Sequence, residues 1–485
     1  MFPIHDDNQP HQTHSRAEDK RDHDVSAAAI SVAQTETDVI YTGPGNKIYE
    51  KHFRPLQRGF PLWIPGPDRC LPLAYRRNGV SIGDVGTITP GGAFSFMFNI
   101  FLPAAHPINP PELPVGFEPL DLPHGGTVDT FQYSEFGPGT FLASPTVEKV
   151  RSSDPLFRGM TFKTYSAEGA ILTFPDGAVT HNALNILSIR TYTQAYLASW
   201  YRFANGLHGR KLKNGGLHVV TGCDKATSWG MAAISNFDAE RHSLKYYRSP
   251  DNRDSKLGNA HASIPLYEWE CTGHTEAKVG PDLQEIEELR HAAEEAGIDV
   301  GGRQGKFYNQ CLFLRTLNPA LSEDEYKAIE REIAIESEAH DHQRRARPKL
   351  RAADGSGTGT QEAGSGQQSE SNSGKDSADL LAPKIESRSS ESQLLALGNV
   401  TWLENPWMPN SRRAHPADHL NKHLLELYPH CNAVITHDND WCAVVSDSDK
   451  IMPSPEEITR RVLATHDVVE RDGLVYLELK RKIET

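Results

Sequence analysis

The sequence predicts an α+β protein made of several modules. Three observations support this prediction. A Pro- and Gly-rich stretch from Val39 to about Leu156 contains short alternating apolar runs, an aromatic segment near 182–205 has helical periodicity, and a second mixed pattern returns near the C-terminus. A chain of 485 residues has room for two or three folded units.

Composition narrows the functional classes. The net charge of −14, from 64 acidic and 50 basic residues, disfavours broad nucleic-acid binding. The six cysteines form no CxxC pair, which favours free thiols in a reducing compartment. No apolar run reaches the length of a transmembrane segment, and the first forty residues contain no apolar signal core. We therefore expect a soluble intracellular protein, located in the cytoplasm.

The predicted β-rich domain spans 39–278 and contains a clear hairpin. Strands Val80–Thr89 and Ala93–Leu102 flank a Pro90-Gly91-Gly92 turn. The second strand places its large apolar side chains at every other position: Phe94, Phe96, Phe98, Ile100 and Leu102. This period of two predicts one apolar face that a second layer must cover.

A second hairpin and one helix follow in this domain. Apolar residues of Ala170–Phe174 precede a Pro175-Asp176-Gly177 turn, which predicts another strand pair. Apolar and aromatic residues then recur at steps of three and four: Ile186, Ile189, Tyr192, Tyr196, Trp200 and Phe203. They predict an amphipathic helix that ends in a left-handed cap at Asn205-Gly206.

The next segment, 279–352, is charged and reads as helical. Helices are predicted at Pro281–Ala296 and Ser322–Ile335, both largely solvated. The basic run from Arg344 to Arg351 is either a nuclear import signal, an acidic-partner contact or a solvated helix end. Residues 1–38 predict a disordered tail and residues 353–398 a flexible linker.

A small α/β module is predicted over 399–485. Its expected elements are a helix at Pro416–Leu427, strands near Ala433–Thr436 and Trp441–Val445, a helix at Pro455–Thr465 and a hairpin over Val468–Leu479. The linker predicts that this module is tethered and mobile.

Histidines in this module raise the question of a metal site. His415, His419 and His423 lie four residues apart, but no glutamate completes an HExxH pattern. His437 to Asp440 reads as a turn between two strands. We therefore predict neither a metal nor a cofactor.

The segment Leu217–Asn236 carries the candidate ligand or interaction residues. We expect two strands joined by a turn that holds Cys223, Asp224, Lys225, Thr227, Ser228 and Trp229. The candidate residues among them are Cys223, Asp224, Lys225 and Trp229. A structural turn, a ligand-contact turn and covalent catalysis are the three interpretations. Catalysis by Cys223 would need a base such as His218 or His208 and a lowered thiol pKa.

A second possible nucleophile is Ser81, within the GxSxG pattern Gly79–Gly83. A nucleophile elbow needs a helix after the serine, whereas DVGTIT is strand-like. The pattern therefore favours a glycine-bordered bend or bulge.

Several strings resemble a large family of uncharacterised fungal proteins of the mushroom (basidiomycete) type. They are HGRKLKNGGLHVVTGCDKATSWGMAAISN, SIGDVGTITPGGAFSFMFNIFLPAAHPIN, SAEGAILTFPDGAV and HPADHLNKHLLELYP with ITHDNDW. The resemblance covers about 40–280 and 400–480 and implies a fungal, intracellular protein with a variable linker, but no activity. The strand VVTG also resembles gasdermin-like pore formers, although the acidic charge departs from a lipid-binding surface.

These patterns together predict a non-enzymatic interaction protein with a tethered C-terminal recognition module and an unknown protein partner. One alternative is a gasdermin-like, membrane-active effector that uses the hairpins at Phe94–Phe101 and Ala170–Phe174. Another is a hydrolase that uses Cys223 or Ser81.

Overall fold

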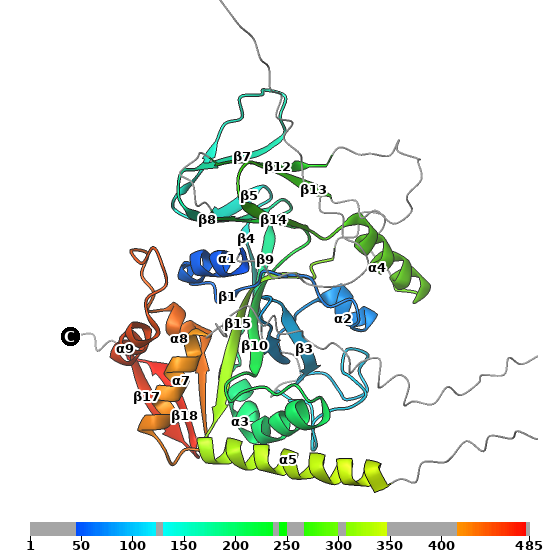
Figure 1. The fold of residues 1–485 in the computed structure, drawn as a ribbon, viewed down its shortest axis with the longest axis vertical. Coiled ribbons are helices and arrows are strands. Elements are labelled where there is room, and N and C mark those ends of the chain that lie inside the picture. Colours follow the sequence, from blue (N-terminus) through cyan, green and yellow to red (C-terminus); the bar gives the residue numbers. More distant parts are fainter. Residues whose placement is uncertain are drawn as a thin grey trace, which may run out of the picture. The chain divides into compact units, whose positions relative to one another are not determined.

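The computed structural model describes residues 45–122, 130–235, 242–249, 266–298, 307–346 and 415–481. Helices and strands are mixed throughout these residues, which confirms the α+β class (Figure 1). The predicted tail 1–38 and linker 353–398 lie outside them, as does most of the basic run from Arg344 to Arg351. None of the helices in the described part combines the length and apolar character that crossing a bilayer requires.

The largest sheet contains ten strands. Its main path is β17 (His466–Arg471), β18 (Leu474–Leu479), β16 (Ala433–His437), β15 (Gln310–Leu321), β10 (His218–Ala226), β2 (Asp84–Ile88) and β3 (Phe94–Asn99). Three strands branch from this path: β1 (Phe60–Pro61) pairs with β15, β9 (Ala178–Ala183) with β10, and β4 (Thr130–Phe136) with β9.

Strand β15 was not predicted, because the segment 279–352 reads as charged and helical. All twelve of its residues are buried, including Arg315, Thr316 and Asn318. A strand covered on both faces loses the alternation that marks a half-exposed strand. The expectation of a purely helical segment is wrong here, and this strand instead runs through the centre of the molecule.

The central sheet divides where β10 and β15 change partners. β10 pairs with β2 at His218 and Val219, and with β9 from Gly222 onward. β15 pairs with β1 at Phe313 and Leu314, and with β16 from Leu317 onward. The register between β10 and β15 shifts between Val220 and Gly222, so Thr221 is the extra residue of a bulge. We call this region the branch point.

Two further sheets of four strands each pack face to face. The first contains β14 (Thr275–Gly280), β11 (Trp229–Ser235), β8 (Glu168–Phe174) and β5 (Thr140–Ala143). The second contains β13 (Tyr267–Cys271), β12 (His242–Arg248), β7 (Gly159–Thr164) and β6 (Val147–Val150). Phe162, Ile171 and Leu244 share the apolar cluster between them. Helix α1 (Gly45–Phe53) covers the other face of the first sheet with Tyr49 and Phe53.

The hairpin at Pro90-Gly91-Gly92 is confirmed as β2 and β3, but it has no exposed face. Phe94 and Phe96 pack in one cluster with Leu314, whereas Phe98 and Ile100 belong to another. The register of the β2–β3 pair shifts between Val85 and Gly86, at the point where the strand passes from one cluster to the other.

The second predicted hairpin is wrong. β8 pairs with β5 and β11, whereas β9 pairs with β4 and β10. The turn at Pro175–Gly177 therefore passes the chain from one sheet to another. Turn residues specify a reversal but not the partner that each flanking strand chooses.

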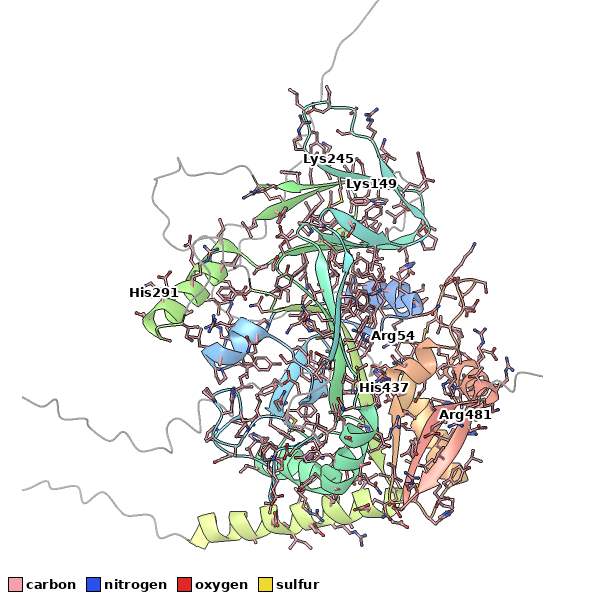
Figure 2. The ribbon with its side chains drawn as sticks, turned by 180° about the vertical axis from the view of Figure 1, so that it is seen from behind. Arg54, Lys149, Lys245, His291, His437 and Arg481 are labelled. Carbon is pink, nitrogen blue, oxygen red and sulfur yellow. The ribbon has the colours of Figure 1, made fainter. Side chains whose placement is uncertain are left out.

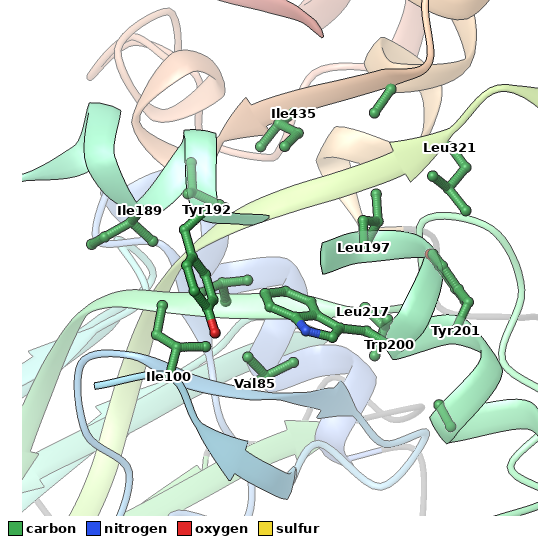
Figure 3. Packing of buried hydrophobic residues seen from close by; sticks show 14 of the residues in the cluster. Val85, Ile100, Ile189, Tyr192, Leu197, Trp200, Tyr201, Leu217, Leu321 and Ile435 are labelled. Atoms are coloured by element: carbon green, nitrogen blue, oxygen red, sulfur yellow. The ribbon is translucent and has the colours of Figure 1, made fainter. Parts of the chain in front are cut away.

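The aromatic helix is confirmed as α3 (Ile186–Arg202), and Figure 3 shows Ile189, Tyr192 and Trp200 in its core. A π-helical turn, Phe203–Leu207, follows it, and Gly209 is the first residue after the helix with positive φ, so the left-handed cap predicted at Asn205-Gly206 is wrong. The other described helices that precede the C-terminal elements are η1 (Arg54–Leu56), α2 (Leu73–Asn78), α4 (Leu283–Glu295) and α5 (Glu323–Ala346). The two charged helices are thereby confirmed, and Tyr326 and Ile329 of α5 join the α3 core.

The C-terminal elements α7 (Pro416–Leu427), β16, α9 (Pro455–Thr465) and the β17–β18 hairpin match the prediction. The strand near Trp441–Val445 does not, because α8 (Asp438–Cys442) begins directly after β16. β16 pairs with β15 over five residues, and Ala433 and Ile435 join the α3 core. This segment therefore belongs to the central sheet, which differs from a separately tethered module.

A buried carboxylate fixes this attachment. Asp438, fully buried at the start of α8, accepts hydrogen bonds from Thr316 N (2.7 Å), Asn318 Nδ2 (2.8 Å) and Trp441 Nε1 (3.0 Å). The Thr316 hydroxyl lies 3.0 Å from the same carboxylate. Charge-assisted hydrogen bonds on every side keep a buried carboxylate stable, and removing such a partner is costly.

We predict that Asp438→Asn destabilises the protein by about 3 kcal/mol, because an amide presents a donor to Thr316 or Asn318 where an acceptor is required. Urea unfolding followed by circular dichroism measures this change. Asp467→Asn, at an exposed position of β17, serves as the matched control and should change stability by less than about 0.5 kcal/mol. Equal stability of the two variants would show that Asp438 does not hold the sheet together.

Candidate functional site

A pocket of about 390 Å³ opens at the branch point. Its walls come from the η1 turn, β4, the β9–α3 connection, β10, β15 and the start of α8. The lining residues are Leu56, Gln57, Arg58, Phe131, Tyr133, Asn182, Ala183, Leu184, Ile186, Thr221, Arg315, His437 and Asn439. We call it the branch-point pocket. Figure 2 labels His437, which the C-terminal segment contributes to this wall.

The guanidinium groups of Arg58 and Arg315 form its floor, and both pair with one carboxylate buried beneath them. Asp224, fully buried in β10, accepts from Arg58 Nε (2.7 Å) and from Arg315 Nη2 (3.0 Å). Arg315 also donates to Asn182 Oδ1 (2.7 Å) and to the carbonyls of Arg58 and His181. Arg315 is therefore held on several sides by β9, β10 and the η1 turn, which makes it a rigid positive group.

Arg58 also contacts a second, partly exposed carboxylate. Its Nη2 donates to Glu135 Oε2 (2.6 Å), a carboxylate on β4 whose side chain is 39% exposed. Burial disfavours the charged form of Arg58, but Glu135 and Asp224 outweigh it and raise the pKa of the guanidinium. The hydrogen bond from Arg58 in turn lowers the pKa of Glu135. Arg58 is thus charged, with one fixed and one exposed carboxylate as partners.

Gly222 allows this arrangement. A Cβ there would lie 2.4 Å from Asn182 Oδ1, 2.6 Å from Arg315 Nε and 3.0 Å from the His181 carbonyl. Distances below 3.0 Å force neighbouring atoms to move, and the carbonyl belongs to the backbone of β9. Any side chain at 222 would therefore separate Arg315 from Asn182.

The bulge residue Thr221 meets His437 in the wall. The backbone N–H of Asn439 donates to His437 Nδ1 (2.9 Å), so the proton of the neutral ring lies on Nε2. Nε2 lies 2.8 Å from Thr221 Oγ1, and the Thr221 hydroxyl donates to the Arg315 carbonyl (3.1 Å). Burial lowers the pKa of His437 to about 4, so the ring is neutral at pH 7. His437 thus donates to Thr221 and cannot act as its base.

A repeated capping pattern places His437. In the His437–Asp440 segment the side chain of His437 caps α8. The backbone N–H of His437 donates to Asp440 Oδ2 (2.7 Å). The same H-x-x-D arrangement begins α7, where the N–H of His415 donates to Asp418 Oδ2 (2.9 Å). The predicted turn at His437–Asp440 is therefore wrong, because these residues begin a helix.

Exposed apolar side chains lie among the residues that line the pocket. Four lining residues are among the exposed large apolar side chains: Leu56, Phe131, Tyr133 and Leu184. We call these four residues the rim. The rings of Phe131 and Tyr133 lie 5.2 Å apart on β4. Apolar side chains gathered around a cavity are typical of binding surfaces.

The four predicted site residues separate in the structure. Cys223, Asp224 and Lys225 belong to β10 and are buried, so the turn between β10 and β11 consists only of Thr227 and Ser228. Their hydroxyls donate to Asp176. Trp229 is buried and donates to Gln310 Oε1 (2.9 Å). The predicted turn position is wrong for all four, and only Asp224 contacts the floor of the pocket.

Neither predicted nucleophile has a base beside it among its described contacts. Cys223 Sγ lies 3.9 Å from the Val80 carbonyl, inside an apolar cluster. A hydrogen bond from Cys311, against the effect of burial, lowers the pKa of the Cys223 thiol. Ser81 Oγ donates to the Gly79 carbonyl, in a bend between α2 and β2 that has positive φ at Gly79 and Gly83. His218, the suggested base, instead shares a hydrogen bond with Asn318.

Sequence reasoning missed Arg58, Arg315 and His437. An arginine within the apolar run QCLFLRTLNPAL was the available signal for Arg315, because a buried arginine requires a partner. The repeated H-x-x-D was the signal for His437. Within the described ranges, histidine, cysteine and carboxylate side chains nowhere gather into a group that could ligate a metal.

No protein-family model, curated protein or solved structure matches this chain in the three comparisons.

We predict that Gly222→Ala destabilises the protein by about 2 kcal/mol, because overpacking must displace Arg315 or Asn182. Gly206→Ala is the control, since its nearest atom would be Ile333 Cγ1 at 3.7 Å. Urea unfolding of both variants tests this. A Gly222→Ala protein as stable as the control would show that the branch point tolerates a side chain.

A pH prediction follows from Asp440. Burial raises the pKa of Asp440 to about 7, well above its unfolded value. The stability contributed by this group is therefore complete at low pH and is lost as the pH rises through about 7. His437 acts in the opposite direction, because its lowered pKa costs stability as the pH falls below its ordinary value.

The two contributions are separated by Asp440→Asn, which keeps an acceptor for His437 N. Between pH 5 and 8, wild-type protein should lose about 2–3 kcal/mol more stability than this variant. Urea unfolding at both pH values measures the difference, with Asp467→Asn as the exposed control. An unchanged pH dependence in Asp440→Asn would contradict the raised pKa of Asp440.

Proposed function

We propose that the protein acts by binding rather than by catalysis, and that the branch-point pocket is its recognition site. The observation that carries this proposal is an exposed apolar rim above a floor of rigid, mutually paired polar groups. Leu56, Phe131, Tyr133 and Leu184 offer contact area, while Arg315 and Asp224 are fixed by their own hydrogen bonds. Pre-organised polar groups beside exposed apolar side chains are typical of ligand sites.

The hydrolase alternative receives no support from the geometry. Thr221 and His437 form the hydroxyl–imidazole pair that lines the pocket, but the ring donates to the hydroxyl. A nucleophile needs the reverse arrangement, with the ring accepting the proton. Cys223 and Ser81 lie elsewhere, against backbone carbonyls.

The membrane-active alternative rests on the apolar hairpins. Phe96 and Phe98 of β3 and Leu172 of β8 are buried between layers. Insertion would require these strands to leave the core, which exposes large apolar areas at a cost of about 25 cal/mol per Å². A binding role uses side chains that are exposed already, so we favour it.

The C-terminal segment belongs to this proposed site. His437 and Asn439 form part of the pocket wall, and Asp438 between them joins α8 to β15. Recognition would then require the C-terminal segment together with the strands and helices that precede it, rather than a tethered unit acting alone. Six free thiols fit our proposal of a reducing, cytoplasmic location.

Nile red, a neutral apolar dye, tests the proposed site. Wild-type protein should bind it saturably with increased fluorescence, and Phe131→Ala/Tyr133→Ala should weaken binding at least about tenfold, because two ring contacts are lost. Leu156→Ala/Tyr308→Ala removes two other exposed apolar side chains and should bind the dye as wild type does. Circular dichroism verifies folding. Equal dye affinity in all three proteins would refute the rim as a binding surface.

A further inference from the structure

We infer that the branch-point pocket takes a small carboxylate that carries a flat apolar group. This inference rests on the proposed function of the pocket and adds the chemical class of its ligand. It follows from three features: the sign of the charges that line the pocket, the combination of its polar and apolar walls, and a carboxylate of the chain itself that already contacts Arg58.

The charged lining residues carry one sign. Among the thirteen described residues that line the pocket, the permanently charged side chains are Arg58 and Arg315. Asp224, which pairs with both, is fully buried and is not among the lining residues. A ligand in the pocket therefore meets guanidinium groups, whereas their carboxylate partners Asp224 and Glu135 are not among the lining residues. Arginine recognises carboxylates through its planar fork of N–H donors.

The remaining walls fit a flat apolar group. Phe131 and Tyr133 offer aromatic faces, and Leu184 and Ile186 offer aliphatic contacts in the same cavity. A volume of about 390 Å³ lies within the range of small-molecule pockets. It is suited to a compact acid with one or two rings.

Glu135 indicates how a carboxylate would be held. It accepts from Arg58 Nη2, and its side chain is 39% exposed whereas that of Arg58 is 14% exposed, so solvent weakens this ion pair at its Glu135 end. Asp224 holds Arg58 Nε independently of Glu135. A ligand carboxylate can therefore replace Glu135 on Arg58 without disturbing the floor. Glu135 thus acts as an internal competitor whose removal should strengthen binding.

The test compares 2-naphthoate with 2-naphthamide, a neutral molecule of nearly the same shape, by isothermal titration calorimetry of the full chain. Wild-type protein should bind the acid at least about tenfold more tightly than the amide. Glu135→Gln should tighten the acid several-fold and leave the amide unchanged. Glu148→Gln, at an exposed position of β6, should behave as wild type.

Competition with Nile red identifies the site and separates the two proposals. Displacement of the dye by naphthoate, with the Glu135→Gln gain, supports the carboxylate assignment. Dye binding at the rim together with equal affinities for acid and amide overturns the ligand class and leaves the proposed function standing. If neither dye nor naphthoate binds, both proposals fail. Since Glu135 is exposed, its variant is expected to fold, and circular dichroism verifies this.

Discussion

The hydrogen bonds between the Asp438 carboxylate and β15 are the interaction on which the rest of the structure depends. They join residues 122 positions apart, Thr316 and Asp438, inside a region without solvent. Without them, β16 would have to pair with β15 while the Thr316 backbone N–H and the Asn318 amide lose this acceptor. Because α8 begins at this same carboxylate, its position also sets that of His437 and Asn439. The stability of the central sheet and the shape of the pocket therefore have one origin.

Local patterns sufficed for several helices and turns. The helices at Pro416–Leu427 and Pro455–Thr465, the turn at Pro90–Gly92 and the hairpin over Val468–Leu479 were predicted, since each depends on caps, turn residues and periodicity within a few positions. β15 was missed, because burial on both faces removes the alternation. The strand partners of β8 and β9 were missed for a different reason, since pairing across the fold leaves no short-range signal.

The candidate site was predicted only in part. The sequence draws attention to Asp224 through its reactive neighbours, yet its hydrogen-bond partners Arg58 and Arg315 lie 166 and 91 positions away. No spacing rule connects such residues. Cys223 and Trp229 attracted attention for their chemistry, and the structure uses both in apolar clusters. Buried polar residues within apolar runs, such as Arg315 and Asp438, would have been the better guide, because each must have a partner.

The central claim is that the C-terminal strand β16 and the strands β10 and β15 form one cooperative sheet. This sheet places His437 and Asn439 in the pocket wall. Native-state hydrogen exchange at increasing urea concentrations tests it most directly, by comparing amides of Ala433–His437 in β16 with those of Val219–Ala226 in β10. Our account predicts that both groups exchange through the same global unfolding, with equal free energies. Exchange of the β16 amides through a less costly opening, while the β10 amides remain protected, would contradict it.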